Sequence, residues 1–357
     1  MSPGRREGQQ RRSEAIAAIV GVAGTELDAA EHALFEEYRP AGFILFGRNC
    51  ETPDQVTALV RDLRASISHP EAPVLIDQEG GRVARMKPPH WQALPPARAI
   101  GALAKYDLDA AKDAARLHAR LIAADLEPLG ITVNCAPVLD LGFTGQTEAI
   151  GDRAFSDSPD FVASLGRAAI EGFFAGGVLP VIKHLPGHGR ATVDSHKDLP
   201  CVKVDADHLA CADWLPFKAN ADAPFGMTAH ILYNQLDPAA CATHSASIIR
   251  DVIRGEIGFE GALLSDDLSM QALGGALGDR AARSLEAGCD LALHCNGDLH
   301  EMAAVLDAAG PLEGATYDRF ERALARRRAP EAFDDAAGRE RLQQLLDLAG
   351  PAERAVG

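Results

Sequence analysis

The sequence lacks the features that mark membrane-spanning and nucleic-acid-binding proteins. No uninterrupted apolar run approaches the roughly 18 residues that a membrane-spanning helix requires. Lys and Arg total 35 against 51 Asp and Glu, which gives a formal net charge of -16. Because clustered Lys and Arg provide most of the affinity for phosphate backbones, this charge argues against a nucleic-acid partner. We therefore expect neither a membrane nor a nucleic acid among the partners.

The cysteines form no recognisable framework either. There are seven, an odd number, and no C-x-x-C pair occurs. Their spacing therefore predicts neither a disulfide scaffold nor a zinc ribbon. Cys135, Cys289 and Cys295 lie in or beside expected strands, where free thiols act as small buried apolar groups. Such thiols fit a reducing compartment, and we expect a cytoplasmic protein.

A nucleotide-binding loop is also missing. Gly80 and Gly81, followed by Arg82, suggest a phosphate loop at first sight. Neither G-x-G-x-x-G nor the Walker pattern occurs around them, however, so a nucleotide site is poorly supported. No cofactor is predicted.

Short β-rich segments that alternate with amphipathic stretches predict the fold. The eight expected strands are 16–22, 42–46, 74–77, 131–136, 178–183, 226–230, 262–265 and 291–294. The expected helices between them include 52–67, 107–125, 159–175, 206–219 and 245–255. Strands this apolar leave no face for water, which predicts an α/β fold closed into a single (β/α)8 TIM-type barrel. A doubly wound open sheet is the competing architecture.

Polar residues follow nearly every expected strand, which favours the barrel because all eight strand ends then meet at one mouth. Beyond Gly297 the chain reads as extra C-terminal helices at 299–309, 317–327 and 336–348. We divide the chain into residues 1–14, a disordered N-terminal extension, and residues 15–349, a single catalytic barrel domain. The basic extension has an alternative interpretation as the start of a signal peptide.

One loop carries several groups suited to chemistry. It runs over residues 183–200 as KHLPGHGRATVDSHKDLP and follows the apolar segment VLPVI. Asp194 and His196 are two residues apart, so in an extended segment both side chains lie on the same side. A carboxylate that accepts the imidazole Nδ1 proton fixes the tautomer and presents Nε2 outward. The pair therefore fits a general acid and base.

A zinc site is the alternative for this loop. Four side chains in it could supply ligands: His184, His188, Asp194 and His196. The spacing of the first two suits zinc only in a helix, which Pro186 and Gly187 interrupt. We predict no metal.

Two further carboxylates follow strands. Asp266 continues an apolar strand, where it could be a fixed nucleophile or could stabilise a developing cation. The adjacent Asp267 complicates this assignment, because it could cap a helix beginning near 268. Sequence alone separates the two only by which one directly continues the strand. Asp77 follows another strand. Arg85 and Arg153 fit forked donors to ligand oxygens, with surface ion pairs as the alternative.

Seven motifs together carry a family resemblance. They are FILFGRN, IDQEGGRVAR, NCAPVLD, GDRAFS, KHLPGHGRATVDSH, MTAHI and LLSDDLSM, and they span roughly residues 19–296. In this order they resemble the single-domain bacterial β-N-acetylglucosaminidases of glycoside hydrolase family 3, which act in cell-wall recycling. The chain departs from the usual pattern in GDRAF, where GDRSF is more common, in Gly47 and in its N-terminal extension.

The resemblance implies a retaining exo-hydrolase acting on terminal β-linked N-acetylglucosamine. It assigns Asp266 as nucleophile and His196 as acid and base, assisted by Asp194. It assigns the sugar contacts to Asp77, Arg85, Arg153, Lys183 and His184. The implied partner is a small carbohydrate, an N-acetylglucosamine-terminated disaccharide or muropeptide. We expect no cofactor and a monomer.

Three other functions remain open: a phosphorylase that uses the same residues, a metal-dependent barrel hydrolase and a non-catalytic sugar-binding protein. The loop also yields a geometric prediction. Lys183 and His184, tied to a strand end, should be in place without ligand, whereas His196 should lie away from Asp266.

Overall fold

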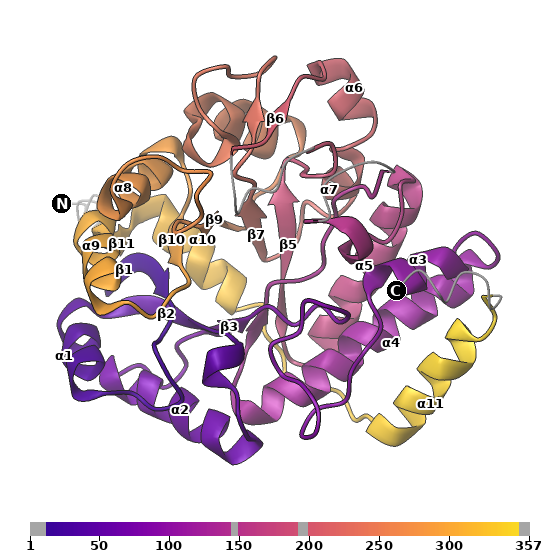
Figure 1. The fold of residues 1–357 in the computed structure, drawn as a ribbon, viewed down its shortest axis with the longest axis horizontal. Helices are drawn as coiled ribbons and strands as arrows, with labels where there is room; N and C mark the ends of the chain where they lie inside the picture. Colours follow the sequence, from indigo (N-terminus) through magenta and orange to yellow (C-terminus); the bar gives the residue numbers. More distant parts are fainter. Residues whose placement is uncertain (1–11, 144–148, 192–198, 350–357) are drawn as a thin grey trace, which may run out of the picture.

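The computed structural model describes residues 12–143, 149–191 and 199–349. Its centre is a closed barrel of eight parallel strands, because the first strand pairs with the last (Figure 1). In spatial order the barrel strands are β1 (Arg12–Val20), β2 (Pro40–Leu45), β3 (Val74–Ile76), β4 (Val133–Asn134), β5 (Leu179–Leu185), β7 (Phe225–Thr228), β9 (Ala262–Asp267) and β10 (Leu291–His294). The predicted TIM-type barrel is confirmed, and each of the eight expected strands overlaps one of these.

Strands buried on both faces explain why the sequence shows apolar runs and no clean alternation. Along β10, Leu291 and Leu293 belong to the core inside the barrel, whereas Ala292 belongs to the core between strands and helices. Along β5, Leu179 and Val181 face inward in the same way. Closing the sheet therefore satisfies both faces, and an open sheet is excluded.

The helices surround the barrel, and most of them connect consecutive strands. They are α1 (Ala29–Tyr38), α2 (Pro53–Ser66), α3 (Ala97–Leu103), α4 (Leu108–Leu126), α5 (Pro159–Ala175), α6 (Ala206–Cys211), α7 (Leu215–Ala219), α8 (Leu277–Ala287), α9 (Leu299–Ala309), α10 (Gly314–Leu324) and α11 (Asp335–Leu346). A π-helix over Ile248–Glu256 replaces the helix expected at 245–255. The Thr52 side chain accepts a hydrogen bond from the backbone N–H of Gln55 and starts α2 where the sequence predicted it.

The single helix predicted over 206–219 is wrong. The chain forms α6 and α7 instead, with a break at residues 212–214. Pro216 has no N–H, and its ring clashes with the preceding turn of a continuing helix. It is tolerated in the first turn of α7, which requires α6 to end before it.

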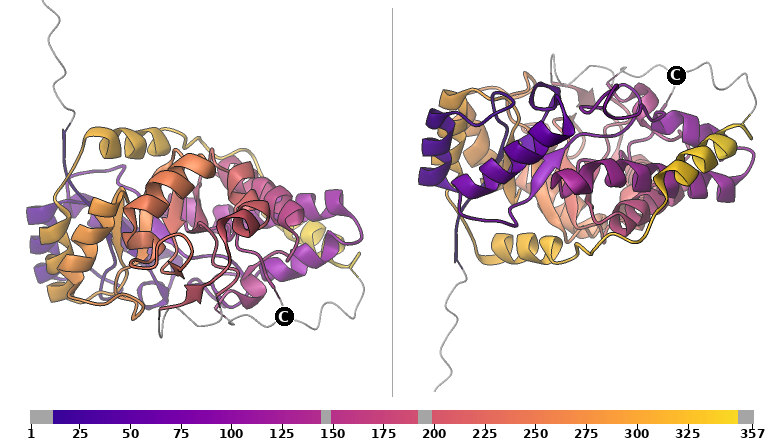
Figure 2. Two further views of the ribbon diagram at one scale, coloured as in Figure 1. Left: turned by 90° about the horizontal axis from the view of Figure 1, so that it is seen from above. Right: turned by 90° about the horizontal axis from the view of Figure 1, so that it is seen from below.

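The end of the barrel opposite the site loops is closed by the C-terminal part of the chain. Strand β11 (Pro311–Glu313) pairs antiparallel with β1, and α10 follows it directly. Phe320 of α10 belongs to the inner core, with its ring centroid 6.2 Å from that of Phe225. Figure 2 shows α10, in yellow-orange, lying along one side of the molecule. The last helix, α11, packs against α4 as a surface addition.

The remaining strands are minor. β6 (Cys201–Val202) and β8 (Leu232–Tyr233) form a small two-stranded sheet of their own. β1 begins at Arg12, so it includes three residues that the predicted division placed in the extension. Residues 1–11 lie outside the described chain. Among the described residues, no helix is both long and apolar enough to cross a membrane.

Candidate active site

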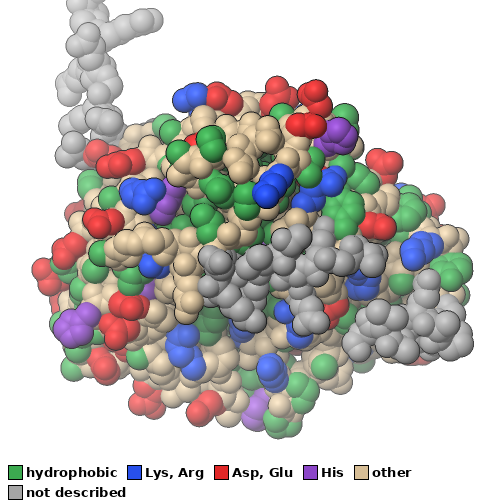
Figure 3. All heavy atoms as spheres, turned by 45° about the horizontal axis from the view of Figure 1, so that its top comes forward, with side chains coloured by type: hydrophobic (Ala, Val, Ile, Leu, Met, Phe, Trp, Pro, Cys, Tyr) green, Lys and Arg blue, Asp and Glu red, His purple; other side chains and the backbone are tan. Residues whose placement is uncertain are grey.

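A cavity of about 310 Å³ lies where the barrel strands end. Six of the eight residues predicted from sequence line it: Asp77, Arg85, Arg153, Lys183, His184 and Asp266. They come from the ends of β3, β5 and β9 and from two loops. This is the carboxyl-terminal face, where barrel enzymes carry their active sites. Acidic side chains lie mostly toward the periphery of the face drawn in Figure 3, and several basic ones lie nearer its middle.

Asp266 belongs to the end of β9, and its side chain lines the cavity. One carboxylate oxygen accepts a hydrogen bond from the backbone N–H of Asp267 at 2.8 Å. Burial tends to raise the pKa of Asp266, but His184, His230, this N–H group and Lys183 together hold it below its ordinary value. Asp266 is therefore ionised near neutral pH, as a nucleophile must be.

The neighbouring Asp267 has a different role. Its Oδ1 accepts hydrogen bonds from the backbone N–H groups of Ser269 at 3.1 Å and Cys295 at 3.0 Å. Its Oδ2 accepts one from the Ser269 hydroxyl at 2.5 Å. Residues 268–273 form turns, and no helix begins there. Asp267 thus fixes the turn that follows β9 and ties it to the end of β10, which distinguishes it from Asp266.

His230, just after the end of β7, binds the backbone at the start of this turn. It is fully buried, and its Nε2 donates a hydrogen bond to the backbone oxygen of Asp267 at 3.0 Å. Its Nδ1 then accepts one from the Thr243 hydroxyl at 2.7 Å. Burial lowers the pKa of His230, which is therefore neutral. The tautomer follows from the partner, since a carbonyl oxygen can only accept.

Five charged side chains at the cavity form a network. The Nζ atom of Lys183 lies 2.7 Å from Asp77 Oδ1 and 2.7 Å from Glu79 Oε1. Arg153 donates to both oxygens of Glu79, at 2.9 and 2.8 Å, and Arg85 Nη2 lies 3.2 Å from Asp77 Oδ2. Burial tends to raise the pKa of Glu79, but Arg153 and Lys183 outweigh it and lower it to about 2. Burial also tends to raise the pKa of Asp77, but Lys183 and Arg85 hold it below its ordinary value, so both carboxylates are ionised at neutral pH.

His184 is held by a carboxylate that the sequence reasoning did not select. Asp140 is fully buried, and its Oδ2 lies 2.6 Å from His184 Nδ1. Its Oδ1 accepts a hydrogen bond from the backbone N–H of His188 at 2.6 Å. Burial tends to raise the pKa of Asp140, but His184 and His188 keep it below its ordinary value. With Nδ1 directed at Asp140, His184 can present Nε2 to the cavity.

Glu79 and Asp140 were thus missed as site residues, although both stand in motifs that carry the family resemblance. Glu79 is two residues after Asp77, and Asp140 ends NCAPVLD. Neither lines the cavity; each acts on side chains that do. A charged residue too buried to reach a ligand, in a loop rich in polar groups, is the signal that could have identified them.

Asp194 and His196 lie outside the described residues, so the predicted position of His196 relative to Asp266 stays a prediction. Lys183 and His184 are adjacent on the cavity wall, joined by a cis peptide bond. Within the described ranges, no group of three or more His, Cys, Asp or Glu side chains is arranged to hold a metal ion. Burial lowers the pKa of His188 to about 4, and its ring packs edge-on against that of His184.

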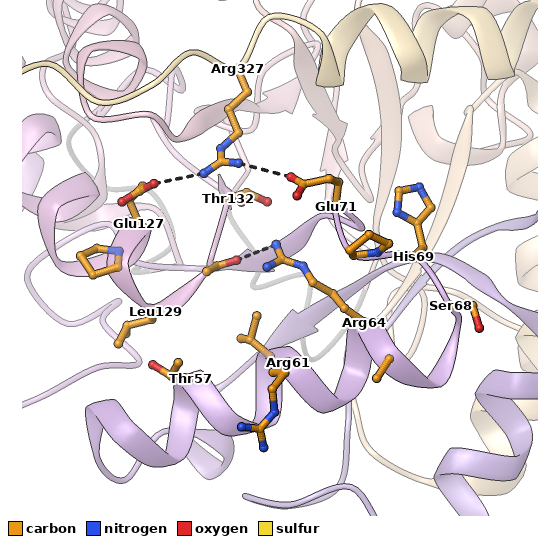
Figure 4. A pocket seen from close by; sticks show the side chains of 15 residues that line it. Thr57, Arg61, Arg64, Ser68, His69, Glu71, Glu127, Leu129, Thr132 and Arg327 are labelled. Atoms are coloured by element: carbon orange, nitrogen blue, oxygen red, sulfur yellow. Dashed lines mark hydrogen bonds and ion pairs between the residues drawn. The ribbon is translucent and has the colours of Figure 1, made fainter.

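A larger hollow of about 750 Å³ lies at the other end of the barrel, beside α2 (Figure 4). Its arginines are occupied by the protein itself. Arg64 donates hydrogen bonds to the backbone oxygens of Ala72 and Gly130, and Arg327 donates to Gly177 and pairs with Glu127. These contacts join α2 and the C-terminal segment to the bottom of the barrel, where a structural role is expected. The smaller cavity is the better candidate because its groups include an ionised carboxylate beside buried cations.

Comparisons with known proteins identify the family. The model of the glycosyl hydrolase family 3 N-terminal domain matches residues 13–327. A protein of Xanthomonas campestris pv. campestris named beta-hexosaminidase is 39% identical over 285 residues, which are 79% of this chain and 85% of that protein.

Two solved structures share the fold. NagZ from Neisseria gonorrhoeae, in complex with N-trifluoroacetyl-D-glucosamine, superposes with a TM-score of 0.82 at 28% identity, covering 94% of this chain and 98% of that one. A family 3 β-N-acetylglucosaminidase from Paenibacillus sp. superposes with a TM-score of 0.76 at 30% identity, covering 95% of this chain but only 61% of that longer one.

The family match covers most of the chain, and the relative from Xanthomonas exceeds 30% identity over most of its own length. The chain therefore belongs to glycosyl hydrolase family 3 and is a glycoside hydrolase similar to the bacterial β-N-acetylglucosaminidases of that family.

Proposed function

We propose that the protein is an exo-acting, retaining β-N-acetylglucosaminidase. Its substrate would be terminal β-linked N-acetylglucosamine on N-acetylglucosaminyl-1,6-anhydro-N-acetylmuramyl sugars and peptides, during peptidoglycan recycling in the cytoplasm. The observation that carries the proposal is the ionised Asp266, which lines a cavity of about 310 Å³ together with the buried cations Lys183 and Arg153. The names of the β-hexosaminidase relative and the NagZ complex support the choice of sugar.

In the proposed reaction, Asp266 Oδ attacks the anomeric carbon as the bond to the leaving oxygen breaks. His196 protonates that oxygen, and the product is a glycosyl ester of Asp266. His196 then takes a proton from water, which displaces Asp266 and releases the sugar with its original configuration. Asp194 would hold the imidazole in the required tautomer.

The buried charges suit recognition of a single sugar unit. Asp77 and Lys183 can bind hydroxyl groups, and Arg85 and Arg153 offer forked donors for hydroxyl or acetamido oxygens. These groups are preorganised by one another, and an analogue that lacks the matching hydroxyl leaves their remaining donor and acceptor positions unsatisfied. This favours a terminal residue of one sugar type.

The test is hydrolysis of an aryl β-N-acetylglucosaminide by wild type, Asp266→Ala and His196→Ala. We expect the Asp266 variant to lose at least about a thousandfold in kcat, since no other group replaces the nucleophile. Trapping the intermediate with a 5-fluoro substrate analogue, followed by peptide mapping, should label Asp266. A label on another residue, or full activity in either variant, would overturn the mechanism.

A phosphorylase is the second candidate, favoured by the cations Arg82, Arg85, Arg153 and Lys183 around the cavity. A histidine acid adds no repulsion against an incoming phosphate. Product analysis in phosphate buffer decides between the two: N-acetylglucosamine 1-phosphate as the main product would replace the hydrolase proposal.

We also propose that residues 15–349 act as one catalytic domain and that the protein is a monomer. Light scattering of the full chain tests the second point, and a mass near twice the 37.8 kDa of one chain would contradict it.

A further inference from the structure

The segment Glu79-Gly80-Gly81-Arg82 matches no nucleotide-binding motif, but its contacts in the structure give it another role. Its two charged ends both face one other segment, residues 149–153, which ends in Arg153. Glu79 accepts two hydrogen bonds from the Arg153 guanidinium, across 74 residues of sequence. Arg82 Nε donates to Asp152 Oδ1 at 2.7 Å. Each segment therefore supplies one acid and one base, so that the acid of each segment pairs with the base of the other.

The glycines make this arrangement possible. Gly80 and Gly81 have φ values of +89° and +58°, in the region that favours glycine. A Cβ atom on Gly80 would lie 2.5 Å from the backbone oxygen of Pro95, and one on Gly81 would lie 2.6 Å from Cβ of Pro96. The backbone of Glu79 also donates to Val83 at 2.9 Å, which closes a tight turn. The turn directs both charged side chains toward the same segment.

A shared acceptor joins the two pairs. Arg82 Nη2 and Arg153 Nη1 each donate a hydrogen bond to the backbone oxygen of Ala149 at 2.9 Å. The inner pair is buried, with 7% of the Glu79 side chain and 12% of the Arg153 side chain exposed. The outer pair lies at the rim, with 47% of Arg82 and 23% of Asp152 exposed. Arg153 is therefore held in two ways. Its side chain pairs with Glu79, and Arg82 binds the backbone segment 149–153 that carries it.

Glu79 also reaches a second cavity residue, because its Oε1 lies 2.7 Å from Lys183 Nζ. Three donors converge on this carboxylate, yet Glu79 itself does not line the cavity. A glutamine there has one oxygen and one NH₂ group, so at least one of the three donors would face another donor. Both carboxylate oxygens of Glu79 are therefore needed to accept all three hydrogen bonds.

We infer that Glu79 and Arg82 are positioning residues that hold Arg153 in the cavity wall and thereby set the affinity for the sugar. The inference rests on the proposed function, in which Arg153 binds the sugar, and goes beyond it by assigning the turn 79–82. It predicts that variants of these residues change binding more than bond breaking, because Glu79 does not line the cavity and Arg82 lies at its rim, paired with Asp152.

The experiment compares wild type with Glu79→Gln, Arg82→Ala, Asp152→Ala and the Arg82→Ala/Asp152→Ala double variant. KM and kcat are measured with an aryl β-N-acetylglucosaminide, and the Kd of N-acetylglucosamine by calorimetry. We expect Glu79→Gln to raise KM and Kd by about a hundredfold, as for a broken buried pair. The half-exposed outer pair should give about a fivefold rise. In all variants kcat should change by less than about threefold.

The double variant separates positioning from independent effects. Arg82 also donates hydrogen bonds to the backbone oxygens of Ala149 and Ile150, so Asp152→Ala should have the smaller effect of the two single variants. The double variant should match Arg82→Ala, in which all of these contacts are already lost. Multiplying effects, or an Arg82→Ala enzyme with wild-type Kd, would overturn the inference for the outer pair. A Glu79→Gln enzyme that melts like wild type and binds the sugar equally well would overturn it for the inner pair.

Arg61→Ala is the matched control. Arg61 pairs with Asp62 at 3.0 Å on α2, at the hollow of Figure 4, and both side chains are exposed. It should leave KM, kcat and Kd unchanged, and melting temperatures show whether each variant folds. If Glu79→Gln does not fold, the Arg82→Ala, Asp152→Ala and double variants still test whether this turn sets the affinity for the sugar. A wild type that binds N-acetylglucosamine but does not cleave the glycoside would refute the proposed function alone, because the calorimetric comparison does not depend on turnover.

Discussion

Replacing Asp140 by alanine would remove one buried carboxylate from beneath the cavity. Two close donors would lose their acceptor: His184 Nδ1 and the backbone N–H of His188, both now at 2.6 Å. A third contact, from the backbone N–H of His184 at 3.3 Å, is too long to contribute strongly. The substitution therefore acts on the positions of two histidines without removing any group that lines the cavity.

The expected effect follows from burial, since Asp140 is fully buried and His184 and His188 are nearly so. Each buried donor left without an acceptor destabilises the fold by about 1–3 kcal/mol. Two such donors give a loss of about 4 kcal/mol in the free energy of unfolding. For a chain of this length about 2 °C of melting temperature corresponds to 1 kcal/mol, so we expect a fall of about 8 °C. Asp140→Asn, which keeps one acceptor oxygen, should lose about half as much.

Thermal unfolding and steady-state hydrolysis together provide the assay. Asp140→Ala should melt lower and, because His184 is no longer oriented, should also show a raised KM. The control is Asp62→Ala, whose side chain is 51% exposed and whose removal should change stability by less than about 0.5 kcal/mol. An Asp140→Ala enzyme that melts within about 2 °C of wild type and keeps its KM would refute the reasoning.

Two other predictions concern the charged wall and the bottom of the barrel. The pKa of Glu79 is lowered to about 2, so its ionised form stabilises the fold above the ordinary glutamate range, and this contribution is lost as pH falls toward 2. The loss in the free energy of unfolding is on the order of 3 kcal/mol. Denaturant unfolding between pH 6 and pH 2 should show this loss for wild type and not for Glu79→Gln. An equal dependence of unfolding free energy on pH in both proteins would contradict the prediction. Phe320→Ala should lower stability by about 3–5 kcal/mol, because the ring fills the inner core, while KM stays unchanged. A changed KM in a folded Phe320→Ala enzyme would show that α10 acts on the site.

The sequence by itself determined the barrel. Eight short apolar segments alternating with amphipathic ones have few ways to bury both faces of every strand, and polar residues at the strand ends indicated where the mouth lies. For the same reason the sequence alone could place Asp77, Lys183, His184 and Asp266 near one another. Each lies in the last three residues of a strand or directly after it, so the fold alone brings them together.

Other features depended on contacts between distant segments. From the residues alone, Asp266 and Asp267 differ only in which one directly continues the strand, whereas the structure separates them by the N–H groups of Ser269 and Cys295 that Asp267 accepts from. The helix expected over 206–219 overlooked Pro216 and was wrong. Local sequence patterns describe which secondary structure a segment tends to form, whereas these outcomes depend on which distant residues contact the segment in the fold.

The buried carboxylates show this division most clearly. Glu79 meets Arg153 across 74 residues, and Asp140 meets His184 across 44. Sequence determined that acids and bases would gather at the barrel mouth. Only the tertiary structure decided which acid neutralises which base and which groups remain open to a ligand, because a buried charge is stable only where the fold brings an opposite charge within hydrogen-bonding distance.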